Sequence, residues 1–126
     1  MKRISTENAP SAIGPYSQAI KLDDMIYLSG QLPISPSTNR IETQDVGAQT
    51  RQVMENIKAI LAEAGLNLSH IVKATIFVCD ITKFDEVNEV YSSYLGEHRP
   101  ARSMVEVSRL PKNALVEIEV IASMKQ

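Results

Sequence analysis

Charged side chains near the end of the chain have the chemistry to act together on a small molecule. Arg102 stands in the run Pro-Ala-Arg-Ser, and Glu117 and Glu119 stand in the run Val-Glu-Ile-Glu. An arginine grips a carboxylate through two parallel hydrogen bonds, an orientation that lysine cannot supply. A glutamate within hydrogen-bond reach accepts from a water molecule or from an imine nitrogen. These residues therefore suggest a site for a small substrate that carries a carboxylate.

A structural role for the same charges is the competing interpretation. Alternation along residues 101–107 puts Arg102, Met104 and Glu106 on one face of a strand, and alternation along residues 115–124 separates Glu117 and Glu119 from an apolar face. We expect one face of this strand pair to line the core and the other to carry the arginine and the carboxylates. From the residues alone, an ion pair between Arg102 and a carboxylate on a neighbouring strand is favoured over a catalytic site.

Other catalytic equipment is missing from the sequence. His70 and His98 stand apart and fit no metal-ligand spacing, and no nucleophile elbow, phosphate-binding glycine loop or dinucleotide fingerprint is present. Any chemistry must therefore use Arg, Glu, Tyr, Ser and backbone groups, with water as a reactant.

Composition indicates a soluble globular protein. The 126 residues, 44% of them hydrophobic and 22% charged, fit one domain spanning residues 1–126. The net charge of -2 provides no general attraction for nucleic acid, so no nucleic-acid partner is expected, and no apolar run reaches membrane-spanning length. The single cysteine, Cys79, fits a reducing compartment. We expect a cytoplasmic protein with no membrane partner.

Hydrophobic patterning predicts the elements that must position these residues. Residues 5–14 read as a loop or edge segment, followed by an opening hairpin with a turn at Asp23-Asp24. Helical spacing and β-branched runs then predict two helices among further strands. The expected strands are residues 16–22, 25–30, 71–79, 101–107 and 115–124, and the expected helices are residues 43–64 and 82–95.

The order of these elements predicts an α+β sheet that is open on one side. The unit from residue 71 to residue 107 predicts a parallel crossover, whose helix covers a fixed face of the sheet. If both helices cover that face, the other face is left open with Met104, Phe77 and charged residues on it. Self-association would bury such a face and turn isolated charges into a site between subunits.

Three blocks of sequence together resemble the RidA (YjgF) family of reactive intermediate deaminases. The first block is Asn-Ala-Pro-Ser-Ala-Ile-Gly-Pro-Tyr-Ser-Gln at residues 8–18, and the second is Leu-Ser-Gly-Gln-Leu-Pro at residues 28–33. The third, closing block lies within residues 100–119 and consists of Pro-Ala-Arg-Ser, Arg-Leu-Pro-Lys and Val-Glu-Ile-Glu. The resemblance covers almost the whole chain.

The resemblance implies a chorismate-mutase-like fold, with a mixed β-sheet and two helices on one face. It also implies a homotrimer with a cleft at each subunit interface. The implied reaction is hydrolysis of reactive 2-imino acids, formed from enamines that pyridoxal-phosphate enzymes release, to 2-oxo acids and ammonia. No cofactor and no metal are implied.

The resemblance also implies roles for particular residues. Arg102 is the carboxylate-binding arginine, and Glu117 is the residue that orients or activates water. The remaining positions associated with the substrate cleft are Tyr16, Ser29, Gly30, Asn88 and the backbone of Met104.

Met104 departs from the family pattern, which usually has cysteine at this position. A mechanism that needs a thiol there is excluded for this chain. Methionine is flexible, so we expect a reshaped pocket and an altered substrate preference.

Two further functions stay open at the sequence level. The same arginine-lined cleft could bind 2-oxo acids as a regulatory module without turning them over. The resemblance also brings in ribonuclease, translation-related and chaperone roles, for which this chain offers little because it has no histidine pair and no basic excess.

Overall fold

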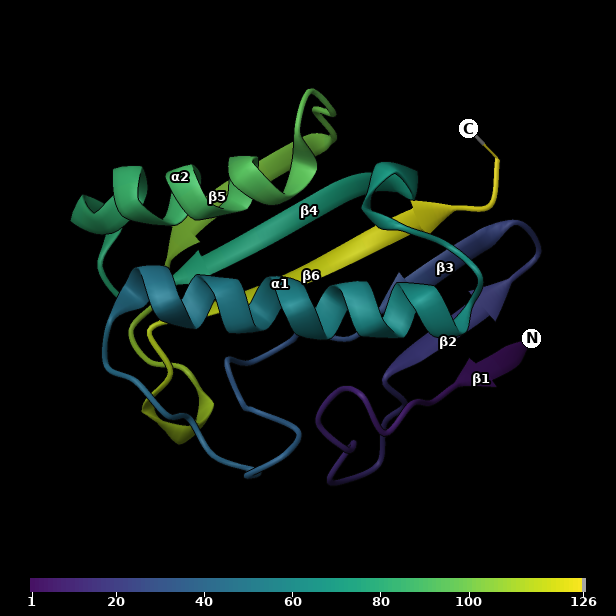
Figure 1. Cartoon of the computed structure of the whole chain (residues 1–126), viewed down its shortest axis with the longest axis horizontal. Coiled ribbons are helices and arrows are strands. Elements are labelled where there is room, and N and C mark those ends of the chain that lie inside the picture. Colours follow the sequence, from purple (N-terminus) through teal and green to yellow (C-terminus); the bar gives the residue numbers. More distant parts are fainter. Residues whose placement is uncertain (126) are drawn as a thin grey trace.

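The computed structural model describes residues 1–125 and folds them into one mixed β-sheet covered by two helices (Figure 1). This α+β arrangement confirms the predicted fold class. The helices are α1 (Val46–Glu63) and α2 (Phe84–Leu95), and the strands are β1 (Lys2–Ile4), β2 (Ala19–Leu22), β3 (Met25–Leu28), β4 (Ile71–Val78), β5 (Ala101–Glu106) and β6 (Val116–Ser123).

The sheet has the strand order β1-β2-β3-β6-β4-β5. β4 and β5 are parallel, as the predicted crossover requires, and α2 connects them. The last two strands of the chain, β5 and β6, do not pair with each other, because β4 lies between them in the sheet. The expectation of a terminal strand pair is therefore wrong: the long β4 strand, with its dense apolar run, occupies the place between them.

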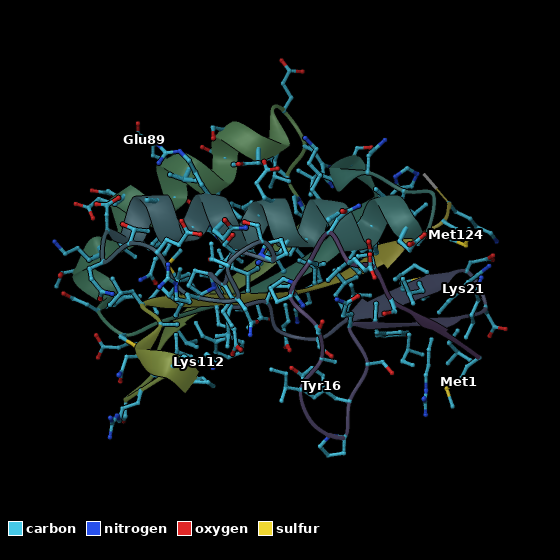
Figure 2. All side chains as sticks on the ribbon, turned by 60° about the horizontal axis from the view of Figure 1, so that its bottom comes forward. Met1, Tyr16, Lys21, Glu89, Lys112 and Met124 are labelled. Carbon is cyan, nitrogen blue, oxygen red and sulfur yellow. The ribbon has the colours of Figure 1, made fainter. Side chains whose placement is uncertain are left out.

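Both helices lie against the same face of the sheet, as the sequence predicts (Figures 1 and 2). α1 begins at Val46 because the Asp45 carboxylate accepts a hydrogen bond from the Ala48 N–H and caps the helix. The second helix begins later than predicted. A short 3-10 turn, Ile81–Lys83, is capped by Asp80, and α2 starts only at Phe84.

The register of β4 decides which way the neighbouring side chains point. Ala74, Ile76 and Val78 are buried under the helices, so their direct partners point to that side and the alternate residues to the other. In β6, Ile118 faces the helices, whereas Glu117 pairs with Phe77 and faces away.

Arg102 and Met104 follow the opposite pattern to the one expected. They pair with Ala74 and Ile76 and therefore lie on the helix side of the sheet, where Met104 packs against the core. The predicted face shared by Arg102 and the β6 glutamates is wrong, and so is the placement of Met104 on the open face. The parallel pairing of β5 with β4 determines which β5 side chains face the helices, and this does not depend on how β6 pairs with β4.

The N-terminal segment differs in one respect from its prediction. Residues 5–14 form the expected loop, but Lys2–Ile4 forms an additional edge strand paired with β2. It is three residues long and carries two exposed cations, which hides it from periodicity arguments. Within the part of the chain described, no helix combines the length and apolarity that a membrane crossing needs.

Candidate active site

A cavity of about 650 Å³ opens on the side of the sheet that the helices leave uncovered. Figure 2 shows the segments of Tyr16 and Lys112 on this side, with the helices on the other. Residues from several distant segments line the cavity, including Tyr16, Ser29, Gly30, Lys112, Glu117 and Glu119. Four of the residues predicted for the site therefore meet here: Tyr16, Ser29, Gly30 and Glu117.

Gly30 leaves the space that the Glu117 carboxylate occupies. A Cβ atom at Gly30 would lie 2.9 Å from Glu117 Cδ and 2.9 Å from Oε2. The neighbouring residue Gln31 exchanges backbone hydrogen bonds with Ile118, of 2.8 and 3.2 Å, which pin this segment to β6. The close approach explains why a residue without a side chain stands at position 30.

The Glu117 carboxyl is half-buried, and its protonation is shifted. Burial raises the pKa of Glu117, and the negative charge of Glu119 on the same strand face raises it further. Glu117 has no hydrogen-bond or salt-bridge partner within residues 1–125. A carboxylate in this state is a stronger base than an ordinary exposed glutamate and remains available to a ligand.

The N-terminal loop is tied down beside this cavity by one buried side chain. Gln18 is 3% exposed; its Oε1 accepts from the Thr6 N–H over 2.7 Å, and its Nε2 donates to Thr6 O and Pro10 O over 3.1 and 2.8 Å. These bonds hold the loop that carries Tyr16, whose ring is half-exposed at the cavity. The Ser29 hydroxyl donates to Ser17 O over 2.6 Å and so ties Ser29 to the segment that carries Tyr16.

Arg102 lies in a different environment, against α2. Its Nη1 donates to Asn88 Oδ1 over 2.6 Å, and its Cζ lies 5.2 Å from the centroid of the Tyr91 ring and 5.7 Å from that of Phe84. Arg102, Asn88, Tyr91 and Arg99 line a hollow of about 360 Å³. No carboxylate forms a salt bridge with Arg102 in the described chain, so the predicted structural ion pair is wrong.

The predicted site residues thus fall into two groups on opposite faces of the sheet. Tyr16, Ser29, Gly30 and Glu117 form one group on the uncovered face, and Asn88, Arg102 and Met104 belong to the helix side. Within one copy of the chain the structure does not bring Arg102 and Glu117 together. Their joint action on a substrate stays a prediction.

Sequence reasoning missed the aromatic partners of Arg102. Phe84 and Tyr91 belong to an apolar stripe that periodicity assigns to the core, and Tyr91 is indeed 5% exposed. The spacing of Phe84, Asn88 and Tyr91 could have revealed this grouping, because residues at such intervals lie on one face of α2.

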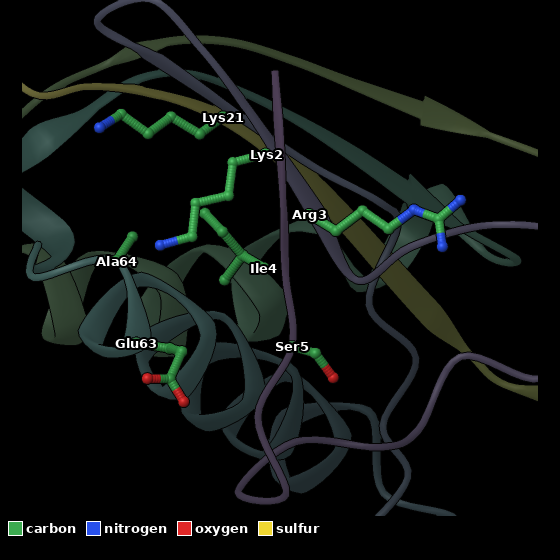
Figure 3. Close-up of a pocket in the computed structure, with 7 residues that line it drawn as sticks. All are labelled: Lys2, Arg3, Ile4, Ser5, Lys21, Glu63 and Ala64. Atoms are coloured by element: carbon green, nitrogen blue, oxygen red, sulfur yellow. The ribbon is translucent and has the colours of Figure 1, made fainter.

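A further hollow of about 400 Å³ lies at the β1 edge, and none of the predicted site residues lines it. Figure 3 shows the Lys2 and Lys21 side chains pointing to the same side, with Glu63 nearby, whereas Arg3 points away from them. The cations do not converge on one point in this hollow.

Both histidines form hydrogen bonds with the backbone, and residues 1–125 contain no group of side chains that could bind a metal ion. His98 Nε2 lies 2.7 Å from Ile71 O, and His70 Nδ1 accepts from the Asn67 N–H over 3.2 Å. Across residues 1–125, no three or more His, Cys, Asp or Glu side chains gather as a metal site would require.

Comparisons with known proteins agree with this architecture. A family model described as Endoribonuclease L-PSP matches residues 6–124. A RutC family protein of Pyrococcus horikoshii is 56% identical over 119 residues, 94% of each chain. The 2-iminobutanoate/2-iminopropanoate deaminase of Escherichia coli strain K12 is 52% identical over 124 residues, 96% of each chain.

A solved structure shares the fold along the whole chain. That structure, Escherichia coli TdcF with bound serine, matches with a TM-score of 0.93 at 46% identity and covers 98% of both chains. The chain therefore belongs to the Endoribonuclease L-PSP family, the family of the RidA and YjgF proteins, as its sequence motifs predict.

Proposed function

We propose that this protein hydrolyses 2-imino acids to 2-oxo acids and ammonia, at sites that each combine two copies of the chain in a homotrimer. The observation that carries the proposal is the separation of two groups on opposite faces of one sheet. Within residues 1–125, Arg102 has no carboxylate partner, and the half-buried Glu117 has no hydrogen-bond partner. Each group is incomplete as a catalytic site by itself. A second copy is the simplest source of the missing half.

The chemistry needs little beyond positioning. A protonated imine carbon is already electrophilic, so the protein has to hold the substrate carboxylate and place a water molecule against the C=N carbon. Arg102 binds the carboxylate through its free N–H groups, and Asn88 orients the guanidinium. Glu117 accepts a proton from the water as it attacks the C=N carbon, and then returns this proton to the amino nitrogen of the tetrahedral adduct. The C–N bond breaks and ammonia leaves, while the hydroxyl group of the adduct gives up its proton and becomes the carbonyl.

Gly30, Ser29 and Tyr16 complete the glutamate half of the proposed site. Gly30 leaves room for the carboxylate, and Tyr16 presents its ring and hydroxyl at the rim of the same cavity. Met104 contributes through its backbone, since its side chain packs against the core. The deaminase name of the Escherichia coli relative supports the reaction proposed for the present chain.

A coupled assay tests the proposal. An amino-acid oxidase with catalase generates imines from several amino acids, semicarbazide traps the imine that remains, and the protein competes with the trap by hydrolysing it. We expect the trapped product to fall when wild-type protein is added and to stay unchanged when Arg102→Ala protein is added. Equal trapping with and without the wild-type protein, across all amino acids tried, would reject the deaminase function.

A binding module without turnover is the second candidate. The TdcF structure holds serine, an amino acid with the carboxylate that Arg102 is suited to bind, and its name states no reaction. Calorimetry with 2-oxobutanoate distinguishes the two functions: binding without any imine hydrolysis favours the module. The endoribonuclease description of the family has no local support here, because both histidines are engaged with the backbone. RNA cleavage that survives repurification and disappears in Arg102→Ala would revive it.

A further inference from the structure

Arg102 is held firmly in place without being neutralised. Asn88 supplies a neutral oxygen to Nη1, and Phe84 and Tyr91 supply ring faces 5.7 and 5.2 Å from the guanidinium carbon. A carboxylate in any of these places would occupy N–H donors and cancel the charge that a ligand carboxylate needs. The surroundings of Arg102 thus keep a cation ready for an anion.

Phe84, Asn88 and Tyr91 form one stripe of α2, which we call the Arg102 cradle. Their intervals along the helix put all three on the same face, where each contacts Arg102 of β5. Aromatic faces attract a guanidinium within about 6 Å of the ring centroid and accept no conventional hydrogen bond from its edge. Only Asn88 therefore takes an N–H in the cradle, and the other N–H groups stay free for two parallel bonds to a carboxylate.

We propose that Phe84 and Tyr91 are positioning residues that hold the Arg102 guanidinium for the substrate carboxylate. This role rests on the proposed function, because it assumes that Arg102 binds the substrate. Tyr91 is only 5% exposed, so the surrounding core holds its ring in place. Phe84 is 39% exposed and lies on the solvent side of the cradle. The Tyr91 hydroxyl has no hydrogen-bond partner among the described residues, so the ring is the part of this side chain that acts.

Phe84→Leu is the variant that tests the role, because a partly exposed side chain can be replaced without opening the core. The matched control is Tyr94→Leu, which removes an aromatic ring from the same helix. Tyr94 donates its hydroxyl to Glu55 and its ring is not one of the two over Arg102. Calorimetric affinity for 2-oxobutanoate and the KM and kcat of imine hydrolysis are measured for both variants.

Loss of one cation–π contact predicts an affinity for 2-oxobutanoate that is roughly 3- to 30-fold weaker in Phe84→Leu. KM rises by a similar factor, and kcat falls less than about twofold, because the glutamate half is untouched. Phe84→Tyr restores the affinity since it restores the ring, and Tyr91→Phe keeps it since only the unpartnered hydroxyl is lost. The Tyr94→Leu control retains wild-type affinity.

The inference is overturned if Phe84→Leu binds 2-oxobutanoate as tightly as Tyr94→Leu does. It is also overturned if Tyr91→Phe loses affinity as Phe84→Leu does, or if wild-type protein does not bind the ligand. Failure of the proposed function gives a different result. Wild-type protein that binds 2-oxobutanoate in a Phe84-dependent way but hydrolyses no imine supports the cradle and rejects the deaminase.

Discussion

Gly30→Ala probes the glutamate half of the proposed site with the smallest possible change. The backbone of Gly30 lies outside the left-handed region, so alanine fits the main chain without strain. The new methyl group would lie 2.9 Å from both Cδ and Oε2 of Glu117, where comfortable contact between carbon atoms needs about 3.5–4.0 Å. The Glu117 carboxylate must therefore retreat by roughly 0.5–1 Å.

The expected cost follows from that displacement. A misplacement of about 1 Å at a reacting group lowers the rate on the order of a hundredfold, so we expect kcat to fall roughly 10- to 100-fold. This corresponds to about 1.4–2.7 kcal/mol of transition-state stabilisation. The affinity for 2-oxobutanoate changes little, because Arg102 binds its carboxylate and the added methyl group displaces only the Glu117 side chain.

The coupled imine assay measures the effect, and Gly47→Ala serves as the matched control. Gly47 stands in α1, away from the cavity, and a methyl group added there would have Asp45 Oδ2 as its nearest neighbour, at 3.3 Å. Circular dichroism establishes that both variants fold. A folded Gly30→Ala protein with wild-type kcat would show that the position of the Glu117 carboxylate does not limit turnover.

The remaining predictions concern the charged groups and the loop. Arg102→Ala abolishes most imine hydrolysis and 2-oxobutanoate binding while leaving a folded assembly; wild-type turnover would contradict the carboxylate clamp. In wild-type protein, kcat rises with pH through the ionisation of Glu117, whose pKa lies above the ordinary value of 4.5, and Glu117→Gln flattens and lowers this profile. Because the folded-state pKa of Glu117 is raised, its contribution to stability is present below the unfolded pKa and is lost as pH rises through the folded pKa. The melting temperature of Glu117→Gln should therefore rise relative to that of wild type as pH rises through that window. A melting-temperature difference that does not change with pH would count against a raised pKa of Glu117. Gln18→Ala leaves loop backbone groups unpaired and lowers the free energy of unfolding by about 1–3 kcal/mol, measured by urea denaturation; no change would show that water replaces these bonds.

Local patterns predicted the parts of the fold that depend on local physics. Alternation in β6 correctly put Ile118 in the core and Glu117 on the other face. Helical spacing placed α1 and α2, with errors confined to their first turns, where Asp45 and Asp80 supply caps. The parallel pairing of β4 and β5 followed from the helix that must connect them.

Long-range register lay beyond the sequence patterns. Whether Arg102 shares a face with Glu117 depends on how β5 aligns with β4, and a shift of one residue would reverse the answer. Periodicity likewise could not tell that the Phe84 and Tyr91 rings face a guanidinium, because a core contact and a cation–π contact need the same spacing. The grouping of Tyr16, Ser29 and Gly30 with Glu117 rested on the family motifs.

Subunit complementation tests whether Arg102 and Glu117 act on one substrate from two copies of the chain. Arg102→Ala and Glu117→Gln proteins, each with strongly reduced activity alone, are unfolded together in equal amounts, refolded and assayed for imine hydrolysis. Random mixing gives about a quarter of the sites one intact arginine and one intact glutamate, so we predict recovery of about a quarter of wild-type activity. A refolded mixture that assembles normally but is no more active than its components would show that Arg102 and Glu117 of different copies do not share a site.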